Sequence, residues 1–341
     1  MIENKICLDE TKQFAAIIGE NPSSGARSPI LWNAAFKKFG LSVRMHPLDV
    51  KPENVAPLID TLRQDNRFLG GAVTMPYKIN IASLVDGLDR EATLIRSINC
   101  IYRDGTSLIG SNTDGAGALA SISEGLNAQN NDLQGKSVMV LGIGGVGRAV
   151  SCYLAPALGR EGRLVLANRN QSGLGNIVNN LKAFCQCELS LLPPPIDLIE
   201  QVDVLVNCTS VGFEGIRTSS KGFYSLSNYS PLGPITEIFR DTNSVTSMTD
   251  YSEAEMNKIK LNNQRSFELL SRFKGFLVYD VMYQPLKSVL LYQSESLGIT
   301  AINGLEMNLD QAVIAFEKVL RASNITKVSV KETREHMLAV N

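Results

Sequence analysis

Histidine is nearly absent from this chain of 341 residues, which contains only His46 and His336. Six cysteines are scattered along it, and the Cys185–Cys187 spacing fits neither a redox pair nor the usual zinc-binding pairs. With so few nitrogen and sulfur ligands at useful spacing, we expect no metal ion held by the protein. The scarcity of histidine also leaves lysine, aspartate or tyrosine as the acid and base of any enzymatic site.

An excess of charge is missing too, because 33 basic side chains balance 34 acidic ones and the formal net charge is −1. This balance argues against a nucleic-acid partner and against an anionic membrane surface. No apolar run is long enough to cross a bilayer, and the first residues show no signal-peptide pattern. We therefore expect a cytoplasmic protein, a monomer or homodimer, whose partner is a small molecule.

The length predicts two domains, and the first third of the chain has a regular strand and helix alternation. Short apolar runs at 13–19, 43–50 and 68–75 are typical of strands. Residues 28–40 and 54–64 have the spacing of helices. Strand, helix and strand in repetition predict an α/β domain with a mainly parallel sheet.

A second α/β pattern begins near residue 138. Residues 138–159 combine an apolar strand, a glycine turn and a helix, and a strand follows at 163–169. Further strands are expected at 187–192, 203–208 and 276–283. This arrangement predicts a Rossmann-like dinucleotide-binding domain.

A long polar segment rich in Ser, Thr and Asn, at about 213–272, interrupts the strand and helix alternation of the second pattern. We expect a partly mobile insertion with one helix near 252–271, since long structureless loops are uncommon inside compact domains. The predicted substrate-binding and catalytic domain comprises residues 1–114 plus 288–341. The dinucleotide-binding domain comprises 115–287.

Glycines in the turn of the second pattern fit the spacing G-x-G-x-x-G. A strand precedes the match and a helix follows it, which is the context that supports a dinucleotide site over a plain glycine-rich turn. Such a turn brings backbone N–H groups to a pyrophosphate at the helix N-terminus. The predicted cofactor-binding residues here are Gly142, Gly144, Gly145, Val146 and Gly147.

The strand that follows this helix ends in Asn168, Arg169 and Asn170. An NAD site would normally place an acidic residue there to bind the ribose hydroxyls, whereas arginine suits a 2′-phosphate. The sequence therefore favours NADP over NAD, the alternative being an arginine that is simply solvated.

Two polar clusters, at 70–78 and 109–115, lie at the ends of apolar strands, where α/β proteins place ligands. These and five further stretches, in this order, resemble motifs of the shikimate dehydrogenase family, which includes quinate dehydrogenases. The matching stretches are 72–78 (AVTMPYK), 97–100 (SINC), 112–115 (NTDG), 168–170 (NRN), 207–212 (NCTSVG), 280–285 (DVMYQP) and 304–311 (GLEMNLDQ).

This resemblance implies an oxidoreductase of aromatic amino acid biosynthesis that reversibly reduces a 3-dehydroshikimate-like ketone to shikimate with NADPH. Lys78 and Asp114 would be its catalytic pair, because an ammonium beside a carboxylate can pass a proton to the developing alkoxide. The implied substrate-binding residues are Ser28, Thr74, Asn99, Asn112, Tyr283 and Gln311. Thr209 and Ser210 would contact the cofactor.

The first substrate loop departs from the family pattern S-x-S-P. Ser28, at the second serine of this pattern, is expected to cap a helix and to face the substrate. Ala26 occupies the position of the first serine. Gly25 and Trp32 occupy the two positions at which the family pattern has histidine. Arg27 offers a replacement contact for the substrate carboxylate. Two alternatives stay open: a divergent paralogue acting on quinate, aminoshikimate or another cyclitol, and a ligand-binding regulator with little turnover.

Overall fold

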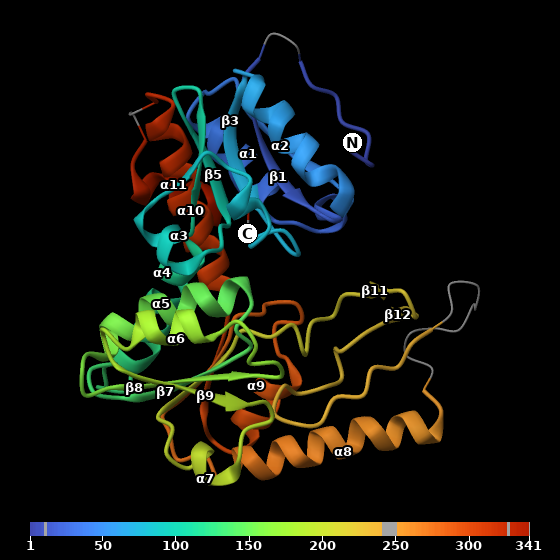
Figure 1. Cartoon of the computed structure of the whole chain (residues 1–341), viewed down its shortest axis with the longest axis vertical. Helices are drawn as coiled ribbons and strands as arrows, with labels where there is room; N and C mark the ends of the chain where they lie inside the picture. The colour runs from blue at the N-terminus through green and yellow to red at the C-terminus, as the bar shows by residue number, and fades with distance from the viewer. Residues whose placement is uncertain (10–11, 241–250, 326–327, 341) are drawn as a thin grey trace. The chain divides into compact units, whose positions relative to one another are not determined.

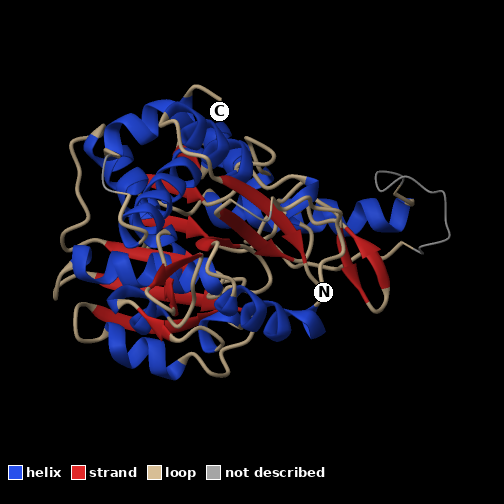
Figure 2. Cartoon of the chain, turned by 90° about the horizontal axis from the view of Figure 1, so that it is seen from above, coloured by secondary structure: helices blue, strands red, loops and turns tan. Residues whose placement is uncertain are grey.

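A computed structural model describes the chain, apart from residues 10–11, 241–250, 326–327 and 341. The chain divides into two compact units (Figure 1), residues 1–117 with 307–341 and residues 118–306. Both are built from strands and helices, as Figure 2 shows by colour. The α/β class expected from the sequence is confirmed. None of the helices in the described part is long and apolar enough to cross a membrane.

The first unit contains a mixed sheet of six strands in the order β2-β1-β3-β5-β6-β4. Its strands are β1 (Phe14–Gly19), β2 (Arg44–Asp49), β3 (Phe68–Val73), β4 (Gly87–Leu88), β5 (Cys100–Asp104) and β6 (Ser107–Ser111). The first three are parallel to one another, whereas β5 runs antiparallel to β3 and to β6. Only two residues join β5 to β6, and so short a turn requires an antiparallel pair.

Helices cover both faces of this sheet. They are α1 (Ser28–Lys38), α2 (Val55–Gln64), α3 (Arg90–Ile95), α10 (Leu305–Ala322), α11 (Val330–Leu338) and the start of α4 (Asp114–Asn127). Ala15 and Ile17 of β1 pack into a core with residues of α1 and α10, while Phe14, Ala16 and Ile18 pack with residues of α2. The alternation along β1 therefore supports two apolar layers, one on each face of the sheet.

The second unit contains an all-parallel sheet in the order β14-β13-β10-β7-β8-β9. Its strands are β7 (Ser137–Leu141), β8 (Arg163–Asn168), β9 (Gln186–Leu191), β10 (Val204–Asn207), β13 (Leu277–Asp280) and β14 (Thr300–Asn303). The chain adds strands to one side of β7 and then to the other. Doubly wound sheets bind ligands at such a reversal, here at the carboxyl ends of β7 and β10.

The remaining helices belong to this unit. They are α5 (Gly145–Leu158), α6 (Gly175–Leu181), α7 (Ile196–Ile199), α8 (Glu253–Leu270) and α9 (Val289–Ser296). In the central strands β7 and β10 every residue but Ser137 and Asn207 is a buried apolar one, as expected for a parallel sheet whose two faces are both covered.

The borders between the units differ from the expected ones. One lies within α4, after Gly117, close to the predicted position. The other follows Glu306, so residues 288–306 belong to the second unit and the prediction of a return at 288 was wrong. The physical reason is that β14 pairs with β13 and completes the parallel sheet.

The polar insertion is more ordered than a loop. The helix expected near 252–271 is confirmed as α8, which begins with a capping box formed by Ser252 and Glu255. A hairpin of β11 (Arg217–Ser219) and β12 (Gly222–Tyr224) was not predicted. Residues 241–250 of the insertion lie outside the described residues, and its expected mobility is not tested.

Candidate active site

Lys78 and Asp114 form an ion pair in the first unit. Nζ of Lys78 lies 2.6 Å from Oδ2 of Asp114, and the two side chains are 14% and 6% exposed. Lys78 follows β3, and Asp114 is the first residue of α4. Two loops far apart in the sequence therefore bring one ammonium and one carboxylate together with little water around them, which strengthens their interaction.

The loop that carries Lys78 is tied down on both sides. The hydroxyl of Tyr77 donates to the carbonyl of Val50 over 2.6 Å. The carbonyl of Lys78 itself accepts from the N–H of Ile98 over 2.8 Å. These bonds fix the backbone from which the long lysine side chain extends.

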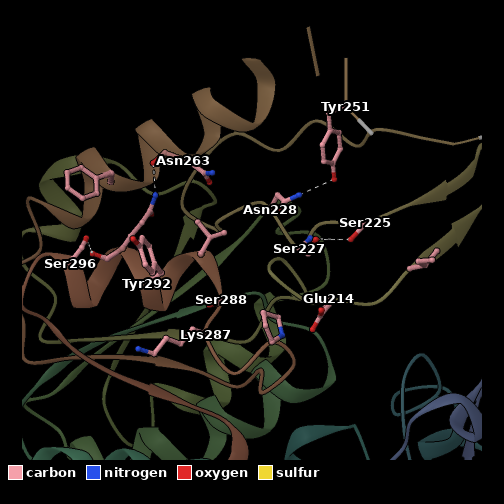
Figure 3. A pocket seen from close by; sticks show the side chains of 15 residues that line it. Glu214, Ser225, Ser227, Asn228, Tyr251, Asn263, Lys287, Ser288, Tyr292 and Ser296 are labelled. Carbon is pink, nitrogen blue, oxygen red and sulfur yellow. Dashed lines mark hydrogen bonds between the residues drawn. The ribbon is translucent and has the colours of Figure 1, made fainter. Parts of the chain in front are cut away.

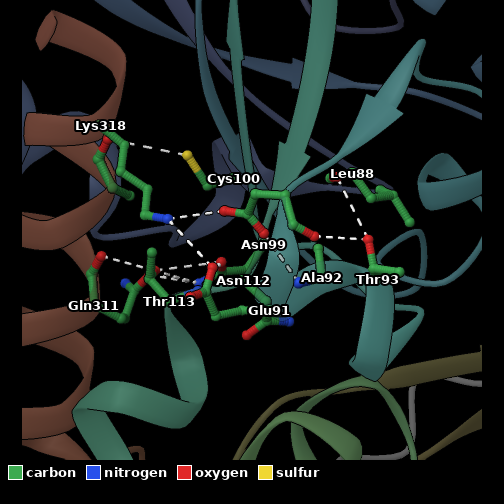
Figure 4. A network of polar contacts seen from close by, with 12 residues as sticks. Leu88, Glu91, Ala92, Thr93, Asn99, Cys100, Asn112, Thr113, Gln311 and Lys318 are labelled. Carbon is green, nitrogen blue, oxygen red and sulfur yellow. Dashed lines mark hydrogen bonds and ion pairs between the residues drawn. The ribbon is translucent and has the colours of Figure 1, made fainter. Parts of the chain in front are cut away.

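Asn99 joins the pair to α10. Its Nδ2 lies 2.8 Å from Oδ1 of Asp114, 2.9 Å from Oγ1 of Thr113 and 3.0 Å from Oε1 of Gln311. Figure 4 shows Asn99, Thr113 and Gln311 converging, with Gln311 projecting from α10. The two carboxylate oxygens of Asp114 thus have separate partners, Lys78 on one and Asn99 on the other.

Asn112 sits behind Asp114 and is fully engaged by the protein. Its Nδ2 donates to the carbonyl of Ser97 over 2.9 Å, and its Oδ1 accepts from the N–H of Asp114 over 3.1 Å. This buried amide therefore orients the first turn of α4, which carries the carboxylate of Asp114.

A second ion pair lies two helical turns along α10 from Gln311, also visible in Figure 4. Nζ of Lys318 lies 2.8 Å from Oδ2 of Asp89, which caps α3 with its other oxygen. Burial opposes the charge on Lys318, but Asp89 and Glu91 outweigh it and raise the pKa of this ammonium. The pair fastens α3 to α10, and the chain leaving α3 leads directly to Asn99.

Two predicted substrate residues, Ser28 and Thr74, have hydroxyls that bond to no other residue in the described part of the chain. Thr74 is half-buried and directly follows β3, and its N–H donates to the carbonyl of Ile18. Ser28 does not cap its helix: α1 begins at Ser28, the cap position belongs to Arg27, and no side chain caps it. The expected capping role was wrong because the helix begins one residue earlier than the serine-proline pattern suggested.

Trp32 and Ala26 take part in packing. Trp32 is 1% exposed and makes edge-to-face contacts with Phe36 and Phe316, at 6.1 and 5.2 Å between ring centroids. Ala26 packs against the same core. The substitution at position 32 therefore adds apolar contact between α1 and α10, and the indole does not face a ligand.

The glycine turn of the second unit has the geometry of a phosphate-binding loop. Gly142 has a φ of +86°, which favours glycine, and a Cβ at Gly147 would lie 1.9 Å from the carbonyl oxygen of Gly142. The backbone around Gly144 has open space. Helix α5, which starts at Gly145 and continues through Val146, has no side-chain cap and no acidic residue in its first turn. Its N-terminal N–H groups therefore suit an anion.

The end of β8 lies beside this turn. Oδ1 of Asn168 accepts from the N–H of Ile143 over 3.2 Å, and its Nδ2 donates to the carbonyl of Asn170. Arg169 is exposed, and no described residue forms an ion pair or hydrogen bond with its guanidinium. Asn168 therefore shapes the glycine turn, while Arg169 presents an unneutralised cation next to it.

The other predicted residues of this unit follow β10 and β13. Thr209 and Ser210 are half-buried in the loop after β10, close to Gly142. Tyr283 is half-buried in the loop after β13.

Three residues that the sequence did not single out complete the two clusters. Thr113 bonds both Asn99 and the carbonyl of Gln311. Asn207 and Asp280 form a buried pair behind Thr209. Each belongs to one of the matched motifs, so motif membership was the available signal, but the contact partners are far away in the sequence.

A cavity of about 950 Å³ lies elsewhere in the second unit (Figure 3). The insertion, α8 and α9 line it, and none of the predicted site residues does. Within it Nδ2 of Asn228 donates to the hydroxyl of Tyr251 over 3.1 Å, and the Ser225 and Ser227 hydroxyls lie 3.2 Å apart. Among the described residues, no group of three or more His, Cys, Asp or Glu side chains could hold a metal ion.

Residues 17–101 match a family model described as the shikimate dehydrogenase substrate binding domain. A shikimate dehydrogenase (NADP(+)) of Carboxydothermus hydrogenoformans is 31% identical over 326 residues, which cover 94% of this chain and 96% of the relative. The corresponding enzyme of Methanococcus maripaludis is 26% identical, with 91% and 92% covered.

Solved structures share the fold. The shikimate 5-dehydrogenase of Thermus thermophilus, solved with NADP(H) and shikimate, gives a TM-score of 0.65 at 22% identity and covers 97% of this chain and all of its own. A 5-ketofructose reductase of a Gluconobacter species gives 0.62 at 22% identity, covering 97% and 99%.

Proposed function

The chain belongs to the shikimate dehydrogenase family, and we propose that it is an NADP-dependent dehydrogenase that interconverts shikimate and its 3-dehydro ketone. The observation that carries this proposal is the half-buried Lys78–Asp114 pair, with Asn99 on the second carboxylate oxygen. An acid and base held in this way meet the proton demand of ketone reduction without histidine.

Several features of the second unit fit NADP. The glycine turn and the uncapped N-terminus of α5 suit a pyrophosphate. Arg169 suits a 2′-phosphate, since a guanidinium forms strong charge-assisted bonds with phosphate oxygens. The relatives named above are NADP(+) enzymes. When bound, the nucleotide would supply the hydride for ketone reduction and accept it in the reverse direction.

The chain's own residues would manage the proton and the substrate. Lys78 would hydrogen-bond the carbonyl oxygen, stabilise the negative charge that develops there and give it a proton from Nζ. Asp114 would hold Nζ in place, and Asn112 and Asn99 would hold Asp114. In the oxidation direction the same ammonium, once deprotonated, would accept the proton of the hydroxyl.

The hydroxyl groups of the substrate would contact neutral side chains, and its carboxylate would contact one cationic side chain. Ser28 and Thr74 offer hydroxyls that have no partner among the described residues, and Gln311 and Tyr283 are further contacts expected from the motifs. Arg27, at the N-cap position of α1, would replace the missing serine at Ala26 as a partner for the carboxylate. Sites that bond each hydroxyl discriminate strongly against analogues lacking one.

One observation favours the alternative substrate class. Ala26 packs into the core and offers no hydroxyl to an acid, and a 5-ketofructose reductase has the same fold, so the fold does not select the substrate. Under this alternative the chain acts on quinate, aminoshikimate or a cyclitol with the same acid and base.

The experiment mixes the purified protein with NADP⁺ and, separately, shikimate, quinate and aminoshikimate, and follows NADPH formation by its absorbance. The proposal expects the highest kcat/KM with shikimate. A clear preference for another member selects the alternative substrate. Nucleotide binding by calorimetry without turnover on any member would contradict both and favour a ligand-binding regulator.

A further inference from the structure

The segment after β10 packs directly against the glycine turn. A Cβ at Gly142 would lie 2.7 Å from Cγ2 and 2.9 Å from the backbone nitrogen of Thr209. The N–H of Cys208 donates to the carbonyl of Leu141 over 2.8 Å, and a Cβ at Gly147 would lie 3.4 Å from that of Cys208. The turn therefore has no room to relax if Thr209 moves toward it.

Asn207 determines where Thr209 lies. Its Oδ1 accepts from both the N–H of Thr209, over 2.9 Å, and its hydroxyl, over 2.7 Å. Oγ1 of Thr209 accepts in turn from the N–H of Val211 over 3.1 Å. This arrangement requires the amide oxygen of Asn207, and not its nitrogen, to face Thr209.

The other side of the Asn207 amide faces Asp280, at the end of the neighbouring strand β13. Nδ2 of Asn207 donates to Oδ1 of Asp280 over 3.0 Å. The same oxygen accepts from the N–H of Met282 over 3.1 Å, and Oδ2 accepts from the hydroxyl of Ser288 over 2.6 Å. An ionised carboxylate only accepts hydrogen bonds, so it excludes the turned-over amide.

Burying the carboxylate of Asp280 at this position also costs free energy. It is 0% exposed, and its hydrogen-bond partners among the residues that the structure describes are all neutral donors. Burial raises the pKa of its carboxyl to about 6, although the three hydrogen bonds act in the opposite direction. Buried carboxyls with perturbed pKa values concentrate at functional positions.

We propose that Asp280 is a positioning residue for nucleotide binding: by orienting the amide of Asn207, it holds Thr209 against Gly142 and keeps the phosphate-binding turn in shape. This inference rests on the proposed NADP function and assigns a role to a residue that does not itself touch the cofactor. If the amide turned over, Nδ2 of Asn207 would face the N–H of Thr209, and both hydrogen bonds to Thr209 and the one to Asp280 would be lost.

The test exchanges the two partners. Asn207→Asp alone places two carboxyl groups at the 3.0 Å contact of the present pair and should weaken NADP⁺ binding at least about tenfold. The double variant Asn207→Asp with Asp280→Asn restores a donor against an acceptor and leaves an acceptor facing Thr209, although the new amide nitrogen then also faces the N–H of Met282, from which Oδ1 of Asp280 accepts in the unaltered protein. Its Kd should therefore recover in part, to at least about threefold below that of Asn207→Asp alone. Kd is measured by calorimetry with NADP⁺ alone, at a temperature where circular dichroism shows every variant folded.

Asp203→Asn is the matched control. Asp203 lies just before β10, at the opposite end of the same strand, where its Oδ2 accepts from the N–H of Ser137 over 2.8 Å. This change removes a comparable carboxylate far from the turn, so the Kd for NADP⁺ should not change. KM for the cyclic substrate should also stay constant in all variants.

The outcomes separate cleanly. Loss of affinity in Asn207→Asp and its recovery in the double variant support the positioning role. An unchanged Kd in Asn207→Asp, a folded double variant that does not recover, or a Kd that simply follows the melting temperature would overturn it. Failure of the unaltered protein to bind NADP⁺ would overturn the proposed function itself.

Discussion

The two units hold their functional groups in opposite ways. In the first, opposite charges meet, because Lys78 lies 2.6 Å from Asp114. In the second, the hydrogen-bond partners of the buried Asp280 carboxylate among the described residues are neutral donors, and glycines form the turn proposed to bind the phosphates. The difference suits the two proposed tasks, since a proton would move in the first and an anion would be surrounded by fixed dipoles in the second.

The largest expected effect comes from breaking the charge pair. Lys78→Ala should lower kcat about 10²- to 10⁴-fold, the usual contribution of general acid–base catalysis, with little change in KM for NADP⁺. Steady-state kinetics in both substrates measures this. Lys51→Ala is the control, because Lys51 pairs with Glu3 on the surface over 3.0 Å and should not affect turnover. Turnover that survives Lys78→Ala would remove the charge pair from the mechanism.

The buried carboxylate of Asp280 should affect how the free energy of unfolding depends on pH. The pKa of Asp280 is raised from 3.8 to about 6 in the folded state, so the folded protein binds a proton more tightly than the unfolded chain. Its stabilising effect is therefore present below about pH 4 and is lost as the pH rises to about 6. Asp280→Asn lacks this titration.

Urea unfolding at several pH values tests the sign. Over that interval the unaltered protein should lose about 3 kcal/mol of unfolding free energy relative to Asp280→Asn. A constant difference between the two proteins would show that the carboxyl of Asp280 does not titrate in this range. Other carboxyl groups cancel in the comparison because both proteins contain them.

Specificity for the nucleotide should depend on one exposed cation in the second unit. Arg169→Ala should raise KM for NADP⁺ about tenfold to a hundredfold, since bonds to charged groups contribute about 1.5–3 kcal/mol, and should leave KM for NAD⁺ unchanged. Arg272→Ala serves as the control, because Arg272 is exposed and faces Glu200 at 3.7 Å. Equal effects on both nucleotides would argue against a 2′-phosphate contact.

The smallest effect concerns the connection that leads to Asn99. Arg96 follows the last residue of α3 as its C-cap, with a φ of 52° in the left-handed region that favours glycine. Left-handed backbone costs a non-glycine residue about 1–2 kcal/mol, so Arg96→Gly should raise the free energy of unfolding by up to about 1 kcal/mol. Thermal unfolding measures this, with Arg90→Gly at the start of the same helix expected to destabilise. A loss of stability in Arg96→Gly would mean that the arginine side chain contributes more than its backbone strain.

Much of the fold and of the candidate site could be predicted from the sequence. Apolar runs located β1 and β7, and the glycine spacing located the turn between β7 and α5, because these signals are local. The position of Lys78 and Asp114 came from motif order. Their mutual distance was an expectation until the structure brought the two loops together.

The remainder depended on contacts between distant residues. Strand β14 has the sequence TAIN and is only partly buried, so it lacks the apolar run that marks the other strands of this sheet, and its pairing with β13 moved the border of the units. Trp32 could be assigned to the core only once α10, nearly three hundred residues later, packed against α1. Asn207 and Asp280 both belong to matched motifs, but nothing local in the sequence predicts that the amide of one meets the carboxylate of the other, 73 residues away.

The most direct test of the proposal that the two units have separate functions compares kcat and KM for NADP⁺ in Lys78→Ala and Asn207→Asp, assayed side by side. The account predicts a large fall in kcat with nearly constant KM in the first, and a raised KM for NADP⁺ in the second. A fall in kcat together with an equal rise in KM in both variants would contradict it.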